Sequence, residues 1–200
     1  MEKRKIPFSP PDITDLEIAE VIQTLKSGWI TTGSRTKQFE REIAAYCGTE
    51  HAVALNSATA CLEAILRLLG IGEEDEVITS AYTYTASASP ICHVAAKLVL
   101  VDVAKDSYEM DYDALENAIT ERTKAIIPID LGGVLCDYER IFEIVERKKS
   151  LFRPSNKFQE VFGRVIVIAD SAHAFGAKKL IRERWKRCGE IADFTSFSFH

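Results

Sequence analysis

Asp170 lies at the expected carboxyl end of a strand, where acidic residues of open α/β sheets can contact ligands. Asp170 directly follows residues 165–169, a run of five apolar residues of which four are β-branched. Such a run is typical of a strand buried on both faces of a parallel sheet. Ligands of these sheets collect at the carboxyl ends of the strands. Asp170 is therefore a candidate ligand-binding acid, although an Asp at such a position more often begins a turn or caps a helix.

Two other segments could contribute to the same edge of a sheet. The hydroxyl-rich turn at residues 56–60 precedes a helical apolar pattern at 62–69. A helix that begins there offers free N–H groups and the positive end of its dipole, which suit a phosphate, although Ser and Thr also cap ordinary helices. Tyr82 and Tyr84 follow the expected strand 76–79, where an aromatic ring can cover a flat ligand or pack in the core.

Pyridoxal phosphate needs all three features: a helix N-terminus for its phosphate, a ring contact, and an acid at its pyridine nitrogen. The acid is the most diagnostic of the three. An ionised Asp170 would keep that nitrogen protonated through a charge-assisted hydrogen bond. The ring could then accept electrons when a substrate carbon loses its proton.

The elements that must position these residues alternate between strands and helices from residue 52 onward, which predicts a mostly parallel sheet covered on both faces. Pro90 must begin or kink its helix, and residues 148–163 form a long connection that is typical of a surface excursion. We expect an extended arm at 1–11, helices at 12–26, 36–47, 62–69, 86–95, 111–119 and 141–145, and strands at 52–55, 76–79, 97–101, 124–129, 165–169 and 193–199.

Composition narrows the class of protein. The net charge of −5 gives no basic footprint for nucleic acid or for an anionic membrane surface. The five cysteines are odd in number, widely spaced and free of Cys-x-x-Cys pairs, which argues against a disulfide scaffold or a metal site and for the cytoplasm. No signal core or apolar run of membrane-spanning length is present. Trp29 lies in a loop between glycines, where core packing is slightly favoured over a ligand or interface contact.

Five motifs occur in the order and spacing of the sugar-nucleotide aminotransferases of the DegT/StrS type, and the Gly28-Trp29 to Gly33 segment matches as well. The chain thus resembles this family from about residue 28 to its end. The resemblance implies a fold-type-I pyridoxal-phosphate enzyme with a three-layer α/β/α large domain and a mostly parallel, mixed central sheet. The motifs are Ser-Ala-Thr-Ala at 57–60, Gly-Glu-Glu-Asp-Glu-Val-Ile-Thr at 72–79, Thr-Lys-Ala-Ile-Ile-Pro at 123–128, Asp-Ser-Ala-His at 170–173 and Ser-Phe-His at 198–200.

The resemblance implies roles for individual residues on the phosphate side of the cofactor. The backbone at Ala58 and Thr59 would hold the phosphate, joined by the hydroxyl of Ser198. We expect residues 1–33 to form an N-terminal arm, helix and loop. Residues 34–200 would form an incomplete cofactor-binding large domain, without the family's small C-terminal domain.

On the ring side, the resemblance implies that Tyr84 stacks on the cofactor and that Asp170 pairs with the ring nitrogen. His173 would lie over or beside the ring near its phenolic oxygen, or would simply be a packed helix residue. Asp170 and His173 are the expected catalytic residues of the chain. No metal site is implied.

Several positions depart from the family pattern. Asp130 stands where the family usually has His, which could alter substrate or dimer contacts. Pro90 lies in a stretch that the family keeps helical, residues 149–163 exceed the usual connection, and Ala169 replaces a common Glu.

The largest departure concerns the family motif Ser-Phe-His-x-x-Lys. The sequence stops at His200, three positions before the lysine that binds the cofactor covalently and shuttles the substrate proton. We therefore expect a fragment of a longer protein or a broken product, and no transaminase turnover from these 200 residues alone.

The implied function of the intact protein is transfer of an amino group, from a donor expected to be glutamate, to a nucleotide-linked keto-sugar for polysaccharide or antibiotic sugar biosynthesis. The ping-pong sequence would pass through pyridoxamine phosphate, in homodimers that share active sites. A sugar dehydratase of the same family, with His in place of the lysine, and a non-catalytic remnant stay open. A dinucleotide site using Asp102 is disfavoured because no Gly-x-Gly-x-x-Gly motif follows a strand.

Overall fold

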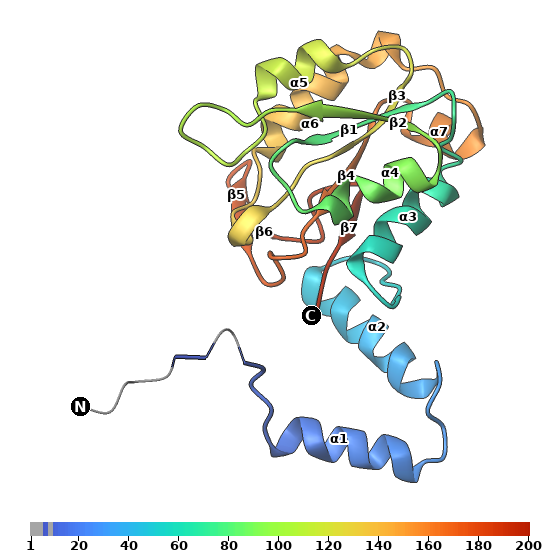
Figure 1. Cartoon of the computed structure of the whole chain (residues 1–200), viewed down its shortest axis with the longest axis vertical. Coiled ribbons are helices and arrows are strands. Elements are labelled where there is room, and N and C mark those ends of the chain that lie inside the picture. The colour runs from blue at the N-terminus through green and yellow to red at the C-terminus, as the bar shows by residue number, and fades with distance from the viewer. Residues whose placement is uncertain (1–5, 8–9) are drawn as a thin grey trace.

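A five-stranded parallel sheet forms the centre of the computed structural model, which describes residues 6–7 and 10–200 (Figure 1). Of the expected arm at 1–11, residues 1–5 and 8–9 lie outside the described residues, and the others belong to no helix or strand. Every neighbouring pair of strands in this sheet is parallel. The strand order is β2 (Lys97–Val101), β1 (Glu76–Ser80), β3 (Thr123–Ile127), β4 (Ile166–Asp170) and β7 (Phe194–Ser196).

Successive residues of the central strands point into two separate hydrophobic clusters, as the period of a strand requires. Ile126 of β3 packs in one cluster, while its neighbours Ala125 and Ile127 pack in the other, and all three are fully buried. The first cluster contains α5 (Tyr112–Ala118) and α6 (Tyr138–Arg147), and the second contains α3 (Ala58–Leu68) and α4 (Ser89–His93). Figure 1 shows these helix pairs on opposite faces of the sheet. The predicted three-layer α/β/α architecture is therefore confirmed.

The helices that flank the site follow from local sequence. In α3, Ser57 is the N-cap and its hydroxyl accepts a hydrogen bond from the N–H of Ala60 at 3.1 Å. Leu62 and Leu66 lie one turn apart on the buried face, and Gly70, at a φ of 65°, takes the left-handed conformation after the helix ends. In the following unit, Pro90 falls in the first turn of α4, where a proline costs little because that N–H has no partner within the helix.

The long connection at 148–163 is less of a surface excursion than the sequence predicted. It contains a 3-10 turn, Lys149–Leu151, and the short helix α7 (Lys157–Phe162). Gln159 of α7 is fully buried and donates to the carbonyl oxygen of Leu69 at 2.9 Å, as does the side chain of Asn156. The connection therefore satisfies a carbonyl at the C-terminal end of α3, the end opposite its N-cap Ser57.

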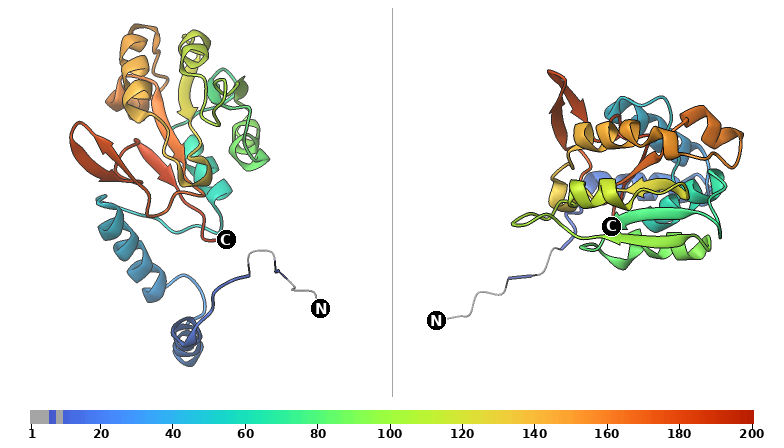
Figure 2. Two further views of the ribbon diagram at one scale, coloured as in Figure 1. Left: turned by 90° about the vertical axis from the view of Figure 1, so that its left-hand side faces the viewer. Right: turned by 90° about the horizontal axis from the view of Figure 1, so that it is seen from above.

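One expected strand is absent, and one hairpin was not expected. Residues 52–55 form no strand: the N–H of Ala54 donates instead to the Glu40 side chain at 3.1 Å, and Val53 is largely exposed. A hairpin that the sequence did not predict follows β4 and consists of β5 (Lys178–Ile181) and β6 (Arg184–Arg187). Figure 2 shows this hairpin projecting from the body of the domain.

The N-terminal helices stand apart from the sheet. α1 (Asp15–Lys26) begins at a capping box between Thr14 and Glu17, and none of its residues is buried. α2 (Ser34–Cys47) buries only Ala44 and Cys47. Figure 1 shows α1 separated from the sheet, with α2 between them. Among the described residues, no helix is both long and apolar enough to cross a bilayer.

Candidate active site

Asp170 is the last residue of β4 and is only 7% exposed. Its Oδ2 accepts a hydrogen bond from the hydroxyl of Ser87 at 2.6 Å, and its Oδ1 accepts one from the N–H of Ala172 at 3.2 Å. Within the described part of the chain, no lysine, arginine or histidine forms an ion pair with it. A buried carboxylate whose partners are all neutral can still bind a cation or a protonated ring nitrogen.

The structure also decides between the two ordinary roles of an Asp at a strand end. Residues 171–173 form a turn, and the bond to Ala172 is the local bond by which Asp side chains begin turns. No helix follows directly, so Asp170 is not a helix cap. The turn uses one carboxylate oxygen, while the other bonds to a residue of a distant segment.

Ser87 connects Asp170 to the tyrosine-containing segment that follows β1. Its hydroxyl shares a 2.8 Å hydrogen bond with Thr83, and its N–H donates to the carbonyl oxygen of Tyr84 at 3.1 Å. The Tyr84 side chain is 80% exposed, whereas Tyr82 packs on Tyr108 with ring centroids 5.3 Å apart. Tyr84 therefore presents a free ring on the segment bonded to Asp170, and its stacking role remains a prediction.

The first turn of α3 lies at the same edge of the sheet. The Ser57 hydroxyl caps Ala60, and within the described residues the N–H groups of Ala58 and Thr59 have no acceptor. These two N–H groups, with the positive end of the dipole of an 11-residue helix, can bind an anion. Ser196, which lies opposite Asp170 in the β4–β7 pair, donates to the carbonyl oxygen of Ala58 at 3.0 Å.

His173 and Ser198 form hydrogen bonds to neither Asp170 nor the first turn of α3 among the described residues. His173 lies in a turn rather than on a helix, and its exposed ring accepts a hydrogen bond at Nδ1 from the N–H of Gly132 at 3.3 Å. The Ser198 hydroxyl bonds only to the N–H of His200, at 3.4 Å, and makes no bond to the α3 turn in the described residues. The roles predicted for both residues stay predictions.

Sequence reasoning missed three residues of this edge: Ser87, Ser196 and Thr195. The hydroxyl of Thr195 is buried beside Ala169 of β4 and is the one buried side-chain polar atom without a partner among the described residues. The signal available from the sequence was the presence of hydroxyl residues within the last strand and in the segment that follows β1. Which of them face Asp170 depends on strand register, which the sequence does not state.

Asp130 is also placed differently from the expectation that it alters substrate or dimer contacts. It is 1% exposed, and its carboxylate bonds to interior groups. A side chain enclosed in this way makes no direct contact with substrate or a partner subunit, and its effect on such contacts stays a prediction.

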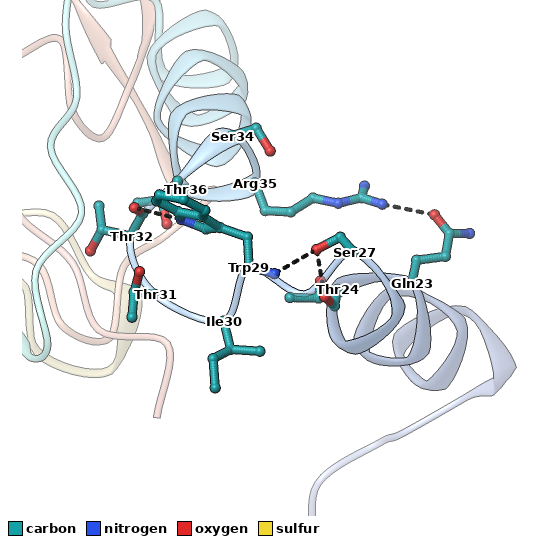
Figure 3. A pocket seen from close by; sticks show the side chains of 11 residues that line it. Gln23, Thr24, Ser27, Trp29, Ile30, Thr31, Thr32, Ser34, Arg35 and Thr36 are labelled. Atoms are coloured by element: carbon teal, nitrogen blue, oxygen red, sulfur yellow. Dashed lines mark hydrogen bonds between the residues drawn. The ribbon is translucent and has the colours of Figure 1, made fainter.

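Two hollows lie outside this edge. Figure 3 shows the first, of about 410 Å³, between α1 and α2. Trp29 lines it and is 63% exposed, with its Nε1 donating to the Thr32 carbonyl at 3.1 Å, so the core packing favoured from the sequence is wrong. The second, of about 650 Å³, extends from Arg35 to Asn56, next to the α3 cap. Asp170 lines neither hollow. No cluster of three metal-ligating side chains occurs among the described residues.

Comparison with known proteins agrees with this architecture. The model of the DegT/DnrJ/EryC1/StrS aminotransferase family matches residues 11–200. The spore coat polysaccharide biosynthesis protein SpsC of Bacillus subtilis is 39% identical over 98% of the chain and 45% of its own length. The UDP-4-amino-4-deoxy-L-arabinose–oxoglutarate aminotransferase of Shewanella sediminis is 38% identical over 89% of the chain and 42% of its own length.

Among solved structures, Spr1654 from Streptococcus pneumoniae, described as a candidate sugar aminotransferase, is 56% identical with a TM-score of 0.94. The match covers 98% of this chain and 48% of that one in its apo form, and structures of its PLP and PMP forms match equally well. The chain thus spans about half the length of the relatives it matches.

Proposed function

Since this chain belongs to the DegT/DnrJ/EryC1/StrS aminotransferase family, we propose that the protein containing it transfers an amino group to a nucleotide-linked keto-sugar, with pyridoxal phosphate as cofactor. The observation that carries this proposal is the buried carboxylate of Asp170 at the same edge as the free N–H groups of α3. A carboxylate can pair with the pyridine nitrogen of this cofactor, and a helix N-terminus can bind its phosphate.

The residues present fit those requirements. Among the described residues Asp170 has only neutral hydrogen-bond partners, so a protonated pyridine nitrogen would supply the positive charge that this buried carboxylate lacks there. Ala58 and Thr59 offer N–H groups that have no acceptor in the part of the chain that the structure describes, at the positive end of α3. When bound, pyridoxal phosphate supplies a conjugated ring that accepts the electrons left when a substrate carbon is deprotonated.

The chain's own residues would then bind and orient the cofactor. Asp170 would hold the proton on the pyridine nitrogen, and Ser87 fixes the carboxylate by donating to its Oδ2. The first turn of α3 fixes the phosphate, with Ser198 as a further donor. Tyr84 would cover one face of the ring, and His173 would lie beside the ring oxygen.

The relatives guide the substrate class. The Shewanella relative is described as acting with a UDP-linked amino sugar and oxoglutarate, and the Bacillus relative as a protein of polysaccharide biosynthesis. By analogy we propose glutamate as the amino donor, because loss of its amino group yields 2-oxoglutarate. A nucleotide-linked keto-sugar of polysaccharide or antibiotic sugar biosynthesis would be the acceptor.

We further propose that residues 34–200 form the cofactor-binding domain and that residues 1–33 are an N-terminal arm, helix and loop. Exposed apolar side chains on α1, such as Leu16 and Leu25, support a protein in which further chain or a second subunit covers this region. A homodimer with shared active sites is proposed accordingly. All five cysteines are free thiols, which supports the cytoplasm as the compartment.

A half-reaction tests the proposed function without knowledge of the sugar. The intact protein, loaded with pyridoxal phosphate and mixed with glutamate but no keto-sugar, should release about one equivalent of 2-oxoglutarate per site and then stop. The cofactor absorbance should change in parallel. Addition of a nucleotide-linked keto-sugar should restart the release and give a product whose mass shows an amino group in place of the keto oxygen.

The aminotransferase assignment would be refuted if glutamate at every concentration released no 2-oxoglutarate and if other amino donors released no keto acid of their own. A sugar product that has lost water without gaining nitrogen would favour the dehydratase alternative. Failure of the protein to bind pyridoxal phosphate or pyridoxamine phosphate would favour the non-catalytic alternative.

A further inference from the structure

Asp130 is a buried carboxylate that the proposed reaction does not use, and its surroundings connect it to the residues that do. It follows β3 by three residues and is 1% exposed. Its backbone N–H donates to the carbonyl oxygen of Asp170 at 3.0 Å, while the N–H of Asp170 donates to the carbonyl oxygen of Pro128 at 2.9 Å. The ends of β3 and β4 are therefore joined at the site by backbone bonds.

The Asp130 side chain gathers donors from separate segments around its two oxygens. Its Oδ2 accepts from the hydroxyl of Ser171 at 2.6 Å, and its Oδ1 accepts from the N–H of Cys136 at 3.0 Å. The phenol of Tyr138 lies 3.0 Å from both oxygens, and the thiol of Cys188 lies 3.7 Å from Oδ2. No Lys, Arg or His forms an ion pair with Asp130 in the part of the chain that the structure describes.

These donors keep their protons at neutral pH. Burial, reinforced by the charge of Asp130, raises the pKa of the Tyr138 phenol well above its ordinary value. Burial likewise raises the pKa of Cys188 to about 12, with the charge of Asp130 contributing. Burial also raises the pKa of Asp130 itself, although the hydrogen bonds that its carboxylate accepts act to lower that pKa. The hydrogen-bond distances define this cluster without reference to the pKa values. Its members are Asp130, Cys136, Tyr138, Ser171 and Cys188.

The cluster reaches the candidate site at two points. Ser171 is the residue next to Asp170, is fully buried, and donates its own N–H to the carbonyl oxygen of Ser196 at 2.9 Å. Two residues beyond Asp130, the N–H of Gly132 donates to Nδ1 of His173. The Asp130 side chain thus holds the start of the turn at 170–173 through Ser171, while the backbone N–H of Gly132 contacts His173 at its other end.

We propose that Asp130 is a positioning residue for the site: through its hydrogen bond with Ser171, it fixes the turn that carries the Asp170 carboxylate. This inference rests on the proposed cofactor chemistry for its functional meaning. It assigns Asp130 no contact with substrate or cofactor. A carboxylate suits this position because both of its oxygens accept hydrogen bonds, whereas an amide of similar size has only one acceptor oxygen.

The experiment uses the intact protein with Ser171→Ala, Asp130→Asn and the double variant. The first readout is affinity for pyridoxamine phosphate, which binds without a covalent link. The second is hydrogen–deuterium exchange of the amides at residues 170–173 without cofactor. Each single variant should weaken pyridoxamine phosphate binding about tenfold, as expected for loss of one buried polar contact, and should speed the exchange. The double variant should be no weaker than the worse single variant, because both act through one bond.

A matched control separates positioning from stability. Thr79 is fully buried and donates to the carbonyl oxygen of Ile127 at 2.8 Å, a bond that involves neither Asp130 nor any residue of the turn at 170–173. Thr79→Val should lower the melting temperature, as Ser171→Ala does, yet leave the affinity and the exchange at 170–173 within about twofold.

Normal affinity and normal exchange at 170–173 in Ser171→Ala would overturn the proposal, and this variant decides the matter if Asp130→Asn does not fold. If wild-type protein binds no pyridoxamine phosphate, the proposed function fails instead. The exchange measurement then still tests whether Asp130 and Ser171 fix the turn.

Discussion

The hydroxyl of Ser87 donates to Oδ2 of Asp170 at 2.6 Å, across 83 positions of sequence. This bond joins the segment after β1 to the tip of β4. Thr83 lies 2.8 Å from the same hydroxyl, and since the Ser87 proton goes to the carboxylate, Thr83 is the donor to Ser87. A short relay of hydroxyl groups thus orients the one acid that the proposed chemistry requires.

Removal of this orienting bond should weaken cofactor binding without abolishing it. Ser87→Ala leaves Asp170 its bond to Ala172, so we expect a loss of about 0.5–1.5 kcal/mol in the binding free energy of pyridoxamine phosphate. Isothermal titration calorimetry of the intact protein with pyridoxamine phosphate measures this binding free energy. An affinity equal to that of wild type would show that the Ser87 bond does not help to hold the carboxylate in its binding orientation.

The start of α3 should matter more for the phosphate than any other helix start. Ser57→Ala removes the cap of α3 and Asp111→Ala removes the cap of α5, and each should cost about 1 kcal/mol of unfolding free energy. Only the first should weaken binding of the phosphate group, because only α3 begins at the site. Equal effects of the two variants on pyridoxamine phosphate affinity would contradict a phosphate seat at Ala58 and Thr59.

Tyr84 should contribute to binding through its ring and not through its hydroxyl. Because its side chain is 80% exposed, Tyr84→Ala should change the unfolding free energy by less than about 0.5 kcal/mol. It should nevertheless cost about 0.5–1.5 kcal/mol in cofactor binding, while Tyr84→Phe keeps the wild-type affinity. If the Phe variant is as weak as the Ala variant, stacking is not the contact that Tyr84 makes.

The free energy of unfolding at acidic pH should depend on Glu76, a buried residue of β1. Burial alone would raise its pKa, but hydrogen bonds from Thr120 and Lys97 and the charges of Arg122 and Lys97 together lower the pKa below its ordinary value of 4.5. A lowered pKa in the folded state contributes stability that is full above the unfolded pKa and lost as the pH falls through the folded pKa.

Glu76→Gln should therefore be less stable than wild type at neutral pH, and the difference should shrink as the pH falls below about 4.5. Urea unfolding of both proteins at a series of pH values measures this difference in unfolding free energy. A difference between the two proteins that is constant from pH 7 to pH 3 would show that ionisation of Glu76 is not linked to folding.

Much of the sheet could be predicted because its information is local. The run at 165–169 is β-branched and buried on both faces, and parallel connectivity then places Asp170 at the ligand-binding edge. Pro128 accounts for the end of β3 at Ile127, earlier than predicted, since a proline has no N–H to extend the ladder.

The remaining features depend on partners that sequence patterns do not identify. Residues 52–55 have the composition of a strand, but in the structure they pair with no neighbour and Val53 is exposed. The β5–β6 hairpin was missed because its turn, Arg182 and Glu183 at positive φ, lacks the Gly or Asn that usually marks such turns. Ser87 and Ser196 meet Asp170 and Ala58 only through tertiary register.

We propose above all that the Asp170 carboxylate keeps a bound pyridine nitrogen protonated. Nitrogen NMR of the intact protein carrying ring-labelled pyridoxamine phosphate reads this proton directly, with wild type compared with Asp170→Asn. We expect a protonated ring nitrogen in wild type throughout the neutral range and an unprotonated one in the variant. The same unprotonated signal in both proteins would contradict the claim.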